Sequence, residues 1–234
     1  MQTTHQLISS EDSLSFLRWA QAEKYGIEYQ SEKHQLAFTG TEKNKAFLRL
    51  PIQTVYFEEN AALTETEKHW VILLVRAGAA SIGYFENGDT IDHKTFHAYM
   101  VRKKQGKSQV KYLNTKGKSR AGSRVRLAST EIFFKEIGQR LDEYLEQYYI
   151  DHICIACAKT LWPFLFNPKV SRLSKADPRI MGVPKHVQHP TFESLLEVNR
   201  FMQMGELKWD GQNPDIKRFF SGSEEKPLDE NDDW

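Results

Sequence analysis

The sequence predicts an α/β domain in which a sheet packs against helices. Residues 70–76 (WVILLVR) form a nearly continuous run of branched aliphatic side chains, which is typical of a strand covered on both faces. The patterns that follow predict two more strands, a long helix and a fourth strand, an order that favours a layered sheet and helices. Hydrophobic residues make up 40% of the 234, enough for a substantial core.

These features predict a single domain over residues 1–220, with its core at about 70–204. The remainder, 221–234, holds six acidic residues and one lysine, so we expect a disordered acidic tail. No apolar run of ~18 residues predicts a membrane span. The first residues lack the pattern of a signal peptide, and two cysteines make no disulfide framework. We therefore expect a cytoplasmic protein without membrane contact.

The first quarter of the chain predicts one helix and several short strands. Ser9, Glu11 and Asp12 resemble a helix start before an amphipathic pattern over 13–24. Alternating apolar residues predict strands at 35–38, 46–50 and 54–57. None of these residues indicates a particular chemistry.

A three-stranded meander is predicted next. Strands at 70–76 and 81–86 precede Asn87-Gly88-Asp89, a strong hairpin signal because Asn-Gly accepts positive φ. The third strand, about 90–102, should place Phe96, Ala98 and Met100 on one face, and His93, Thr95, His97 and Tyr99 on the other.

Helices and one strand complete the prediction. An apolar stripe over 133–148 predicts a long helix that begins between Ser119 and Ser129. An apolar strand follows at 152–158, a proline-rich loop at 167–190, and a helix at 191–204 with Thr191 as its N-cap.

A basic segment separates the meander from the long helix. Residues 102–126 contain ten Lys or Arg and no Asp or Glu, although the whole chain has 32 basic and 31 acidic residues. Such a run repels itself unless a polyanion such as a phosphate backbone neutralises it. Its glycines and serines indicate a loop, and a solvated surface loop is the alternative interpretation. The candidate RNA contacts are Lys103, Lys104, Gly106, Lys107, Ser108, Lys111, Lys116, Lys118, Arg120, Arg124 and Arg126.

Gln109 is the candidate catalytic residue of this loop. An amide has no titratable proton, so Gln109 cannot act as a general base, but it can orient a water or donate to an oxyanion. Gly106 would let the backbone approach a substrate closely. Cys154 and Cys157 form a C-x-x-C without a second pair, so packing is the favoured role and no metal is expected. His186 and His189 lack an apparent third ligand.

Several separated motifs, in order, resemble one known family. HKTFHAYMVRKKQGKSQ (93–109) and KGKSRAGSRVR (116–126), with the preceding strands and the helix start at Pro190-Thr191-Phe192-Glu193, resemble the release-factor-like domain of the ankyrin-repeat and zinc-finger peptidyl-tRNA hydrolase family of ribosome-associated quality control, which has bacterial relatives. The resemblance covers about 70–204. Lys107 departs from the family pattern, which has glycine there, and no zinc finger or ankyrin repeat is present.

The resemblance implies an RNase-H-like mixed sheet flanked by helices, with a long basic loop between a strand and a helix. It implies a hydrolase or nuclease that acts on peptidyl-tRNA on a stalled large ribosomal subunit, without a cofactor. Gln109 would position water at the ester, or a ribose 2′-hydroxyl would attack the adjacent phosphate with Arg102 stabilising charge and His97 carrying a proton. For His97 an ordinary strand histidine is the alternative. For the chain, the alternatives are a non-catalytic RNA- or ribosome-binding protein and, with less support, a metal-dependent nuclease.

Overall fold

The chain divides into two compact units. The structure, a computed structural model, describes residues 3–40, 45–98, 118–211 and 213–222. Residues 223–234, which make up most of the predicted tail, lie outside these ranges. Unit 1 comprises residues 1–66 and 201–234, and unit 2 comprises residues 67–200. That residues 1–220 form one domain stays a prediction.

Among the described residues of unit 2, five strands form a mixed sheet in the order β11-β10-β7-β8-β9. Strand β10 runs parallel to β7 and β11, whereas the β7–β8 and β8–β9 pairs are antiparallel. The strands are β7 (His69–Arg76), β8 (Ala79–Glu86), β9 (Asp89–His97), β10 (His152–Cys157) and β11 (Ile180–Gly182). The predicted α/β class is therefore confirmed.

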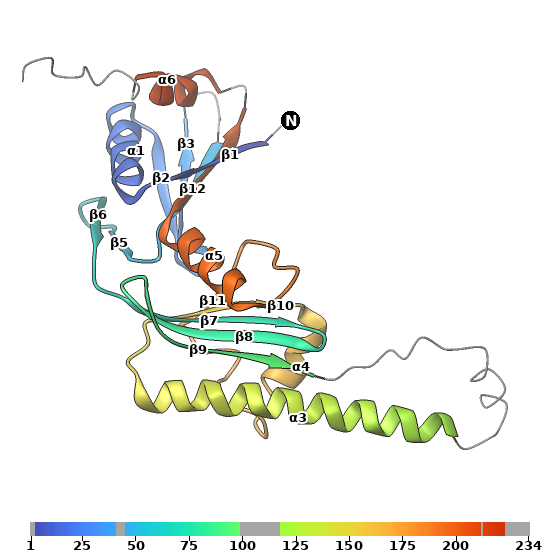
Figure 1. Cartoon of the computed structure of the whole chain (residues 1–234). Helices are drawn as coiled ribbons and strands as arrows, with labels where there is room; N and C mark the ends of the chain where they lie inside the picture. The colour runs from blue at the N-terminus through green and yellow to red at the C-terminus, as the bar shows by residue number, and fades with distance from the viewer. Residues whose placement is uncertain (1–2, 41–44, 99–117, 212, 223–234) are drawn as a thin grey trace, which may run out of the picture. The chain divides into compact units, whose positions relative to one another are not determined.

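Two helices cover opposite faces of this sheet (Figure 1). Helix α3 (Lys118–Gln147) lies along one face, and α5 (Phe192–Gln203) lies on the other. The short helices η2 (Lys159–Leu161) and α4 (Trp162–Leu165) follow β10. Every residue of β7 from Trp70 to Val75 is buried, as the sequence predicts for a strand covered on both sides.

The predicted apolar stripe of α3 forms one half of the core. Phe134, Ile137 and Leu141 are buried against side chains that β7 and β8 present on the same face, including Val71 and Ile82. Each such side chain stabilises the fold by roughly 1.5–3 kcal/mol relative to an exposed position. The helix begins at Lys118, one residue before the predicted window, because helical backbone continues through the basic residues before the stripe.

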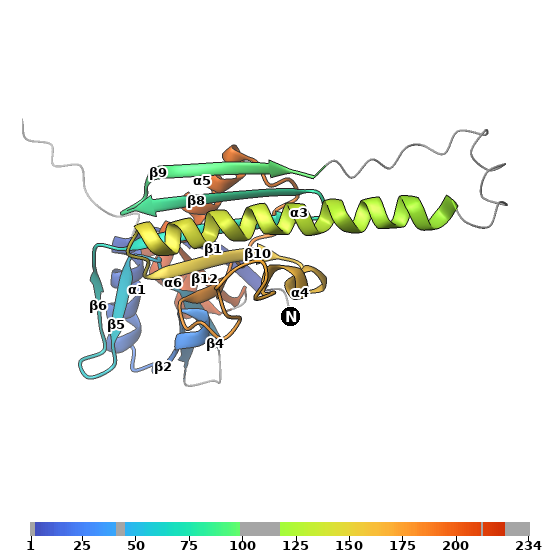
Figure 2. The ribbon, with the colours of Figure 1, turned by 90° about the horizontal axis from the view of Figure 1, so that it is seen from below.

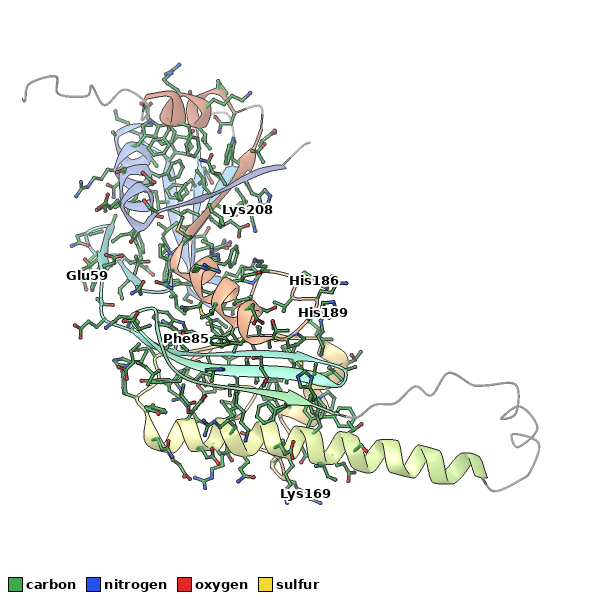
Figure 3. The ribbon with its side chains drawn as sticks, viewed as in Figure 1. Glu59, Phe85, Lys169, His186, His189 and Lys208 are labelled. Carbon is green, nitrogen blue, oxygen red and sulfur yellow. The ribbon has the colours of Figure 1, made fainter. Side chains whose placement is uncertain are left out.

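The other face of the sheet meets α5. The indole Nε1 of Trp70 donates to Asn199 Oδ1 at 3.0 Å, and the Asn199 amide donates to the Gly88 carbonyl at 2.7 Å. Phe85 lies between the sheet and α5 in Figure 3. The Ser194 amide donates to Thr191 Oγ1 at 3.2 Å, which confirms Thr191 as the N-cap of α5.

The predicted hairpin joins β8 and β9. Asn87 and Gly88 both have positive φ, 50° and 100°, as a two-residue turn of this type requires. Along β9, His93, Thr95 and His97 are exposed, while Phe96 is buried, as the alternation predicts. The strand ends at His97, which is shorter than the predicted 90–102; residues 99–102 lie outside the described ranges.

Unit 1 is built from both ends of the chain. Its antiparallel sheet has the order β1-β12-β4-β3-β2, so the strand nearest the N-terminus pairs with β12. Its elements are β1 (Thr3–Ile8), α1 (Ser10–Ala22), β2 (Gly26–Gln30), η1 (Ser31–Lys33), β3 (Gln35–Thr39), β4 (Lys45–Arg49), β5 (Thr54–Phe57), β6 (Ala62–Glu65), β12 (Gly205–Asp210) and α6 (Pro214–Gly222). Strands β5 and β6 form a separate hairpin.

Helices α1 and α6 share the core of unit 1. Phe16 of α1 meets Phe38 of β3 edge to face at 5.1 Å and Phe219 of α6 at 5.2 Å. Ser9 caps α1 with a reciprocal bond to Asp12, where the sequence predicts a helix start, and the helix spans Ser10–Ala22 rather than the predicted 13–24. Among the residues that the structure describes, none of the helices is long and apolar enough to cross a membrane.

Candidate functional site

Most of the predicted site residues lie outside the described ranges. These are Arg102, Lys103, Lys104, Gly106, Lys107, Ser108, Gln109, Lys111 and Lys116. The backbone of α3 carries Lys118, Arg120, Arg124 and Arg126 in its first turns. His97 is described in full. The described part of the candidate site therefore consists of His97 and of the elements that flank the basic segment, β9 and α3.

The flanking strand ends at a shared edge of the sheet. Strand β9 is antiparallel to β8, which is antiparallel to β7, so β9 runs in the same direction as β7. The register pairs His97 with Ala79, and Ala79 with Arg76, while Val75 pairs with Cys157. The carboxyl ends of β7, β9, β10 and β11 therefore meet at one edge of the sheet, the carboxyl edge. Figures 1 and 2 show the first turns of α3 projecting beyond this edge.

His97 is the last residue of β9 and is exposed at the carboxyl edge. No side-chain hydrogen bond or ion pair joins it to another described residue. Both interpretations of His97, a proton carrier and an ordinary strand histidine, therefore stay predictions.

An ion pair holds β9 against α3, the two elements that flank the basic segment. Arg140 of α3 donates through Nη2 to Asp92 of β9, and through Nη1 to Glu143 at 2.8 Å. The guanidinium lies 4.9 Å from the ring centroid of Tyr144. The hydrogen bond to Glu143, together with the charges of Tyr144 and Asp92 in their ionised forms, raises the pKa of Arg140 further above its usual value, although burial opposes the shift. The pair thus joins the strand that precedes the basic segment to the helix that follows it.

A hollow opens at the carboxyl edge beside the end of β7. Its volume is about 330 Å³, within the range of small-molecule sites. Ligands in α/β proteins usually bind outside the carboxyl ends of parallel strands, and β7, β10 and β11 are parallel here. Its lining consists of Val75, Arg76, Ile155, Ala156, Cys157, Ala158, Lys159, Trp162, Gly182, Val183, Lys185, His186 and Val187.

Arg76 is fixed at the rim of this hollow. Its Nε donates to the Val187 carbonyl at 2.7 Å, and its Nη2 lies 2.7 Å from Nε2 of His186. Arginine is a donor only, so the unprotonated ring nitrogen of His186 accepts this bond. Figure 3 shows His186 on the loop that precedes α5, with His189 close by.

Sequence reasoning did not single out Arg76, Lys159, Trp162 or Lys185. They come from segments that are far apart in the chain, and no motif joins them. The available signal was coarse: Arg76 ends a predicted strand, Lys159 and Trp162 follow another, and Lys185 lies in the proline-rich loop.

A match to a known protein family covers the part of the chain that forms the carboxyl edge. The family described as Bacteroidetes VLRF1 release factor matches residues 70–209, which is 140 of the 234 residues. This chain belongs to that family. The matched VLRF1 release-factor region includes nearly all of unit 2, the basic segment and the whole carboxyl edge.

Curated relatives of this VLRF1 chain carry one name. The human protein called tRNA endonuclease ANKZF1 is 28% identical over 134 residues, and those of Bos taurus and Mus musculus are 27% and 24% identical over 134 and 135 residues. The matches cover 55–56% of this chain but only 18% of each relative. The chain thus corresponds to under a fifth of their length.

A solved structure also aligns with the VLRF1 chain. The structure described as the Vms1 mitochondrial localization core covers 86% of this chain and 89% of its own, with 13% sequence identity and a TM-score of 0.43.

The two cysteines of this VLRF1 domain do not form a reactive pair. Both are free thiols; Cys154 is buried and Cys157 packs partly against the core on the α3 side. Burial raises the pKa of the Cys157 thiol to about 11, although the charge of Arg76 opposes the shift. A thiol with that pKa is protonated at neutral pH and is a poor nucleophile and metal ligand. Within the described ranges, no three His, Cys, Asp or Glu side chains gather as metal ligands.

Proposed function

We propose that this chain is a hydrolase or nuclease that acts on peptidyl-tRNA in stalled ribosomal complexes. The observation that carries the proposal is the VLRF1 release-factor match, which spans the basic segment with Gly106, Ser108 and Gln109. The name tRNA endonuclease given to ANKZF1 supports tRNA as the substrate class. The large ribosomal subunit, in the cytoplasm, is the proposed setting.

The proposed fold of the matched region is RNase-H-like. The mixed five-stranded sheet with helices on both faces supports this assignment. In this proposal the basic segment extends from the carboxyl edge between β9 and α3. It carries the amide of Gln109 to the acceptor end of the tRNA, while its lysines and arginines neutralise phosphates.

Two bonds are candidates for cleavage. In ester hydrolysis, Gln109 orients a water that attacks the carbonyl joining peptide to ribose, and the ribose oxygen leaves with a proton. In strand cleavage, a ribose 2′-oxygen attacks the adjacent phosphorus, the 5′-oxygen of the next nucleotide leaves, and a cyclic phosphate remains. Arg102 would stabilise the phosphorane charge, and His97 would carry the proton.

Because His97 is exposed at the end of β9, it can transfer a proton to a substrate that reaches the carboxyl edge. His97→Ala should then reduce strand cleavage by about 10²–10⁴-fold, the usual contribution of a positioned acid or base, without weakening RNA binding. Loss of binding together with activity would instead assign His97 to substrate contact.

The test is product analysis on a defined stalled complex. Purified large subunits that carry a peptidyl-tRNA labelled at both the peptide and the RNA are incubated with the wild-type chain and with Gln109→Ala. We expect the wild type to release the peptide and Gln109→Ala to bind the complex without releasing it. Mapping the 3′ end of the RNA distinguishes an intact CCA end, left by ester hydrolysis, from a shortened one.

The same measurement separates the enzyme from a non-catalytic binding protein. Lys107→Gly, which restores the glycine of the family pattern, serves as the matched loop variant and should retain or increase release. The enzymatic proposal is contradicted if both the wild type and Lys107→Gly leave the substrate intact under conditions in which a known release factor acts. Binding that depends steeply on salt and survives Gln109→Ala would then identify a binding protein.

A further inference from the structure

We propose that the hollow at the carboxyl edge binds one nucleotide of a single-stranded RNA segment. Its base stacks on Trp162, and its phosphate meets Arg76 and Lys159. The inference deepens the proposed function, on which it rests, because it adds a second RNA contact on the described part of the domain. It involves none of the residues of the basic segment.

The lining of the hollow is cationic. Arg76, Lys159 and Lys185 contribute positive charge, and no Asp or Glu is among the lining residues. Lys185 Nζ lies 3.5 Å from Glu197 Oε2, and this carboxylate offsets part of the positive charge of Lys185. Within the described part of the chain, no carboxylate lies within ion-pair distance of Arg76 or Lys159. Two cations without acidic partners at one rim favour an anionic ligand.

The geometry of Arg76 suits a phosphate. Its bonds to the Val187 carbonyl and the His186 ring hold the guanidinium in place before any ligand binds. A guanidinium has five N–H donors, and these two partners use only part of them. A fixed planar donor loses little conformational entropy on binding and can contact two phosphate oxygens at once.

Trp162 provides a surface for stacking. The indole lines both this hollow and an adjacent one of about 530 Å³, formed by Lys159, Trp162, Pro163, Phe166 and Lys175. Its Nε1 donates to the Cys157 carbonyl at 3.3 Å, which fixes the plane of the ring. Lys175 Nζ lies 5.1 Å from the ring centroid. A fixed aromatic ring with lysines around it is the combination by which single-stranded nucleic acid is bound without sequence readout.

The position of the hollow connects it with the basic segment. Arg76 pairs with Ala79, and Ala79 pairs with His97, so the rim lies two strands away from the end of β9. At about 4.8 Å between neighbouring strands, this separation is roughly 10 Å. One RNA strand would reach both the hollow and the base of the basic segment.

The experiment measures binding of a short RNA to the full chain. The probe is a fluorescein-labelled 12-nucleotide single strand with the sequence of a tRNA acceptor 3′ end, and fluorescence anisotropy is recorded over a series of salt concentrations. Trp162→Ala should weaken binding by about 5- to 100-fold, the usual loss for one stacked base, while Trp162→Phe should retain most of the affinity. Lys159→Ala should lower the slope of log K against log salt by about 0.7.

Controls separate the hollow from general charge and from misfolding. Lys169→Ala removes an exposed lysine of the same unit that lines neither hollow, so it should leave the affinity within twofold (Figure 3). Lys159 is exposed, so its replacement preserves the core even if Trp162→Ala perturbs the fold. In a second readout, an RNA with 4-thiouridine near its 3′ end should crosslink to the peptide that contains Lys159 and Trp162.

Two outcomes would overturn this inference. One is wild-type affinity and salt slope in both Trp162→Ala and Lys159→Ala. The other is competition by adenosine monophosphate at a lower concentration than by the RNA, which would assign the hollow to a free mononucleotide. Either result can coexist with peptide release that depends on Gln109. Conversely, binding that requires Trp162 in a chain that releases no peptide would support the hollow and reject the proposed function.

Discussion

The imidazole of His93 stacks on the phenyl ring of Phe192, with the ring centroids 3.9 Å apart and the planes 22° from parallel. His93 begins the strand motif that precedes the basic segment, and Phe192 begins α5, almost a hundred residues later. The two motifs that the sequence presents separately are therefore in direct contact. The contact holds the start of α5 against the strand that leads to the basic segment.

This contact should be measurable as a coupling energy. In a double-mutant cycle, His93→Ala and Phe192→Ala should show an interaction of about 0.5–1.5 kcal/mol in the free energy of unfolding, the usual contribution of an aromatic pair. Urea denaturation followed by circular dichroism provides the values. As a control, His97→Ala and Phe192→Ala should be additive, because His97 lies about 13 Å further along the strand.

The ion pair between Arg140 and Asp92 should stabilise the frame of the basic segment. Arg140→Lys keeps the charge but loses the forked contact to Asp92 and Glu143, so we expect a loss of about 1 kcal/mol in the free energy of unfolding. Hydrogen exchange should also accelerate in β9. Arg172→Lys is the matched control, since Arg172 and Glu146 form an exposed pair that should contribute almost nothing. Equal losses in the two variants would contradict the assigned role.

Gly138 permits a close approach between α3 and the loop before β11. A Cβ at this position would lie 2.1 Å from the Val170 carbonyl oxygen, so one of the two segments must move. In an open helix, Gly→Ala stabilises by about 1 kcal/mol; here Gly138→Ala should instead destabilise by roughly 1–3 kcal/mol. Thermal unfolding checks the sign. Gln139→Ala, at the exposed neighbouring position, should leave the melting temperature nearly unchanged.

The raised pKa of Cys157 predicts a slow thiol. A shift from the ordinary value of 9.0 to about 11 reduces the thiolate fraction about 100-fold at pH 7 to 8. Alkylation by iodoacetamide in a Cys154→Ala background should be slower than that of a free thiol by this factor. In denaturant the ordinary rate should return.

The same shift has a consequence for stability. Between pH 9 and 11 the unfolded chain releases the Cys157 proton while the folded chain keeps it, so the free energy of unfolding falls as the pH rises through this window. In Cys157→Ala this part of the decline should be absent. A fast native thiol at pH 8 would contradict the burial seen here.

Local patterns predicted the elements of unit 2 well. The apolar run at residues 70–76, the Asn87-Gly88 turn and the stripe of α3 each report a local environment, and tertiary packing agrees with them. The basic segment and its candidate contacts were also visible, because charge segregation is a property of the sequence itself. Their roles stay predictions, since the residues concerned lie outside the described part of the chain.

Long-range pairing was beyond the reach of these patterns. Nothing in residues 3–8 indicates that they pair with 205–210, because a strand's partner is set by the global fold. The three-residue strand β11 is too short for a periodic signal. The sequence patterns did not indicate the hollow for the same reason, because Arg76, Trp162 and His186 come together only when β7, β10 and β11 align.

The pairing of β1 with β12 determines the order in which this protein can fold during its synthesis. Unit 2 is continuous in sequence, so its sheet is complete once residue 200 has left the ribosomal exit tunnel. Strand β12 must be translated before it can fill its place between β1 and β4, so the segment made first waits for the one made nearly last. A nascent chain cut short before residue 205 therefore carries a complete sheet in unit 2 and an incomplete one in unit 1, where β1 has no partner strand and β4 pairs with β3 alone.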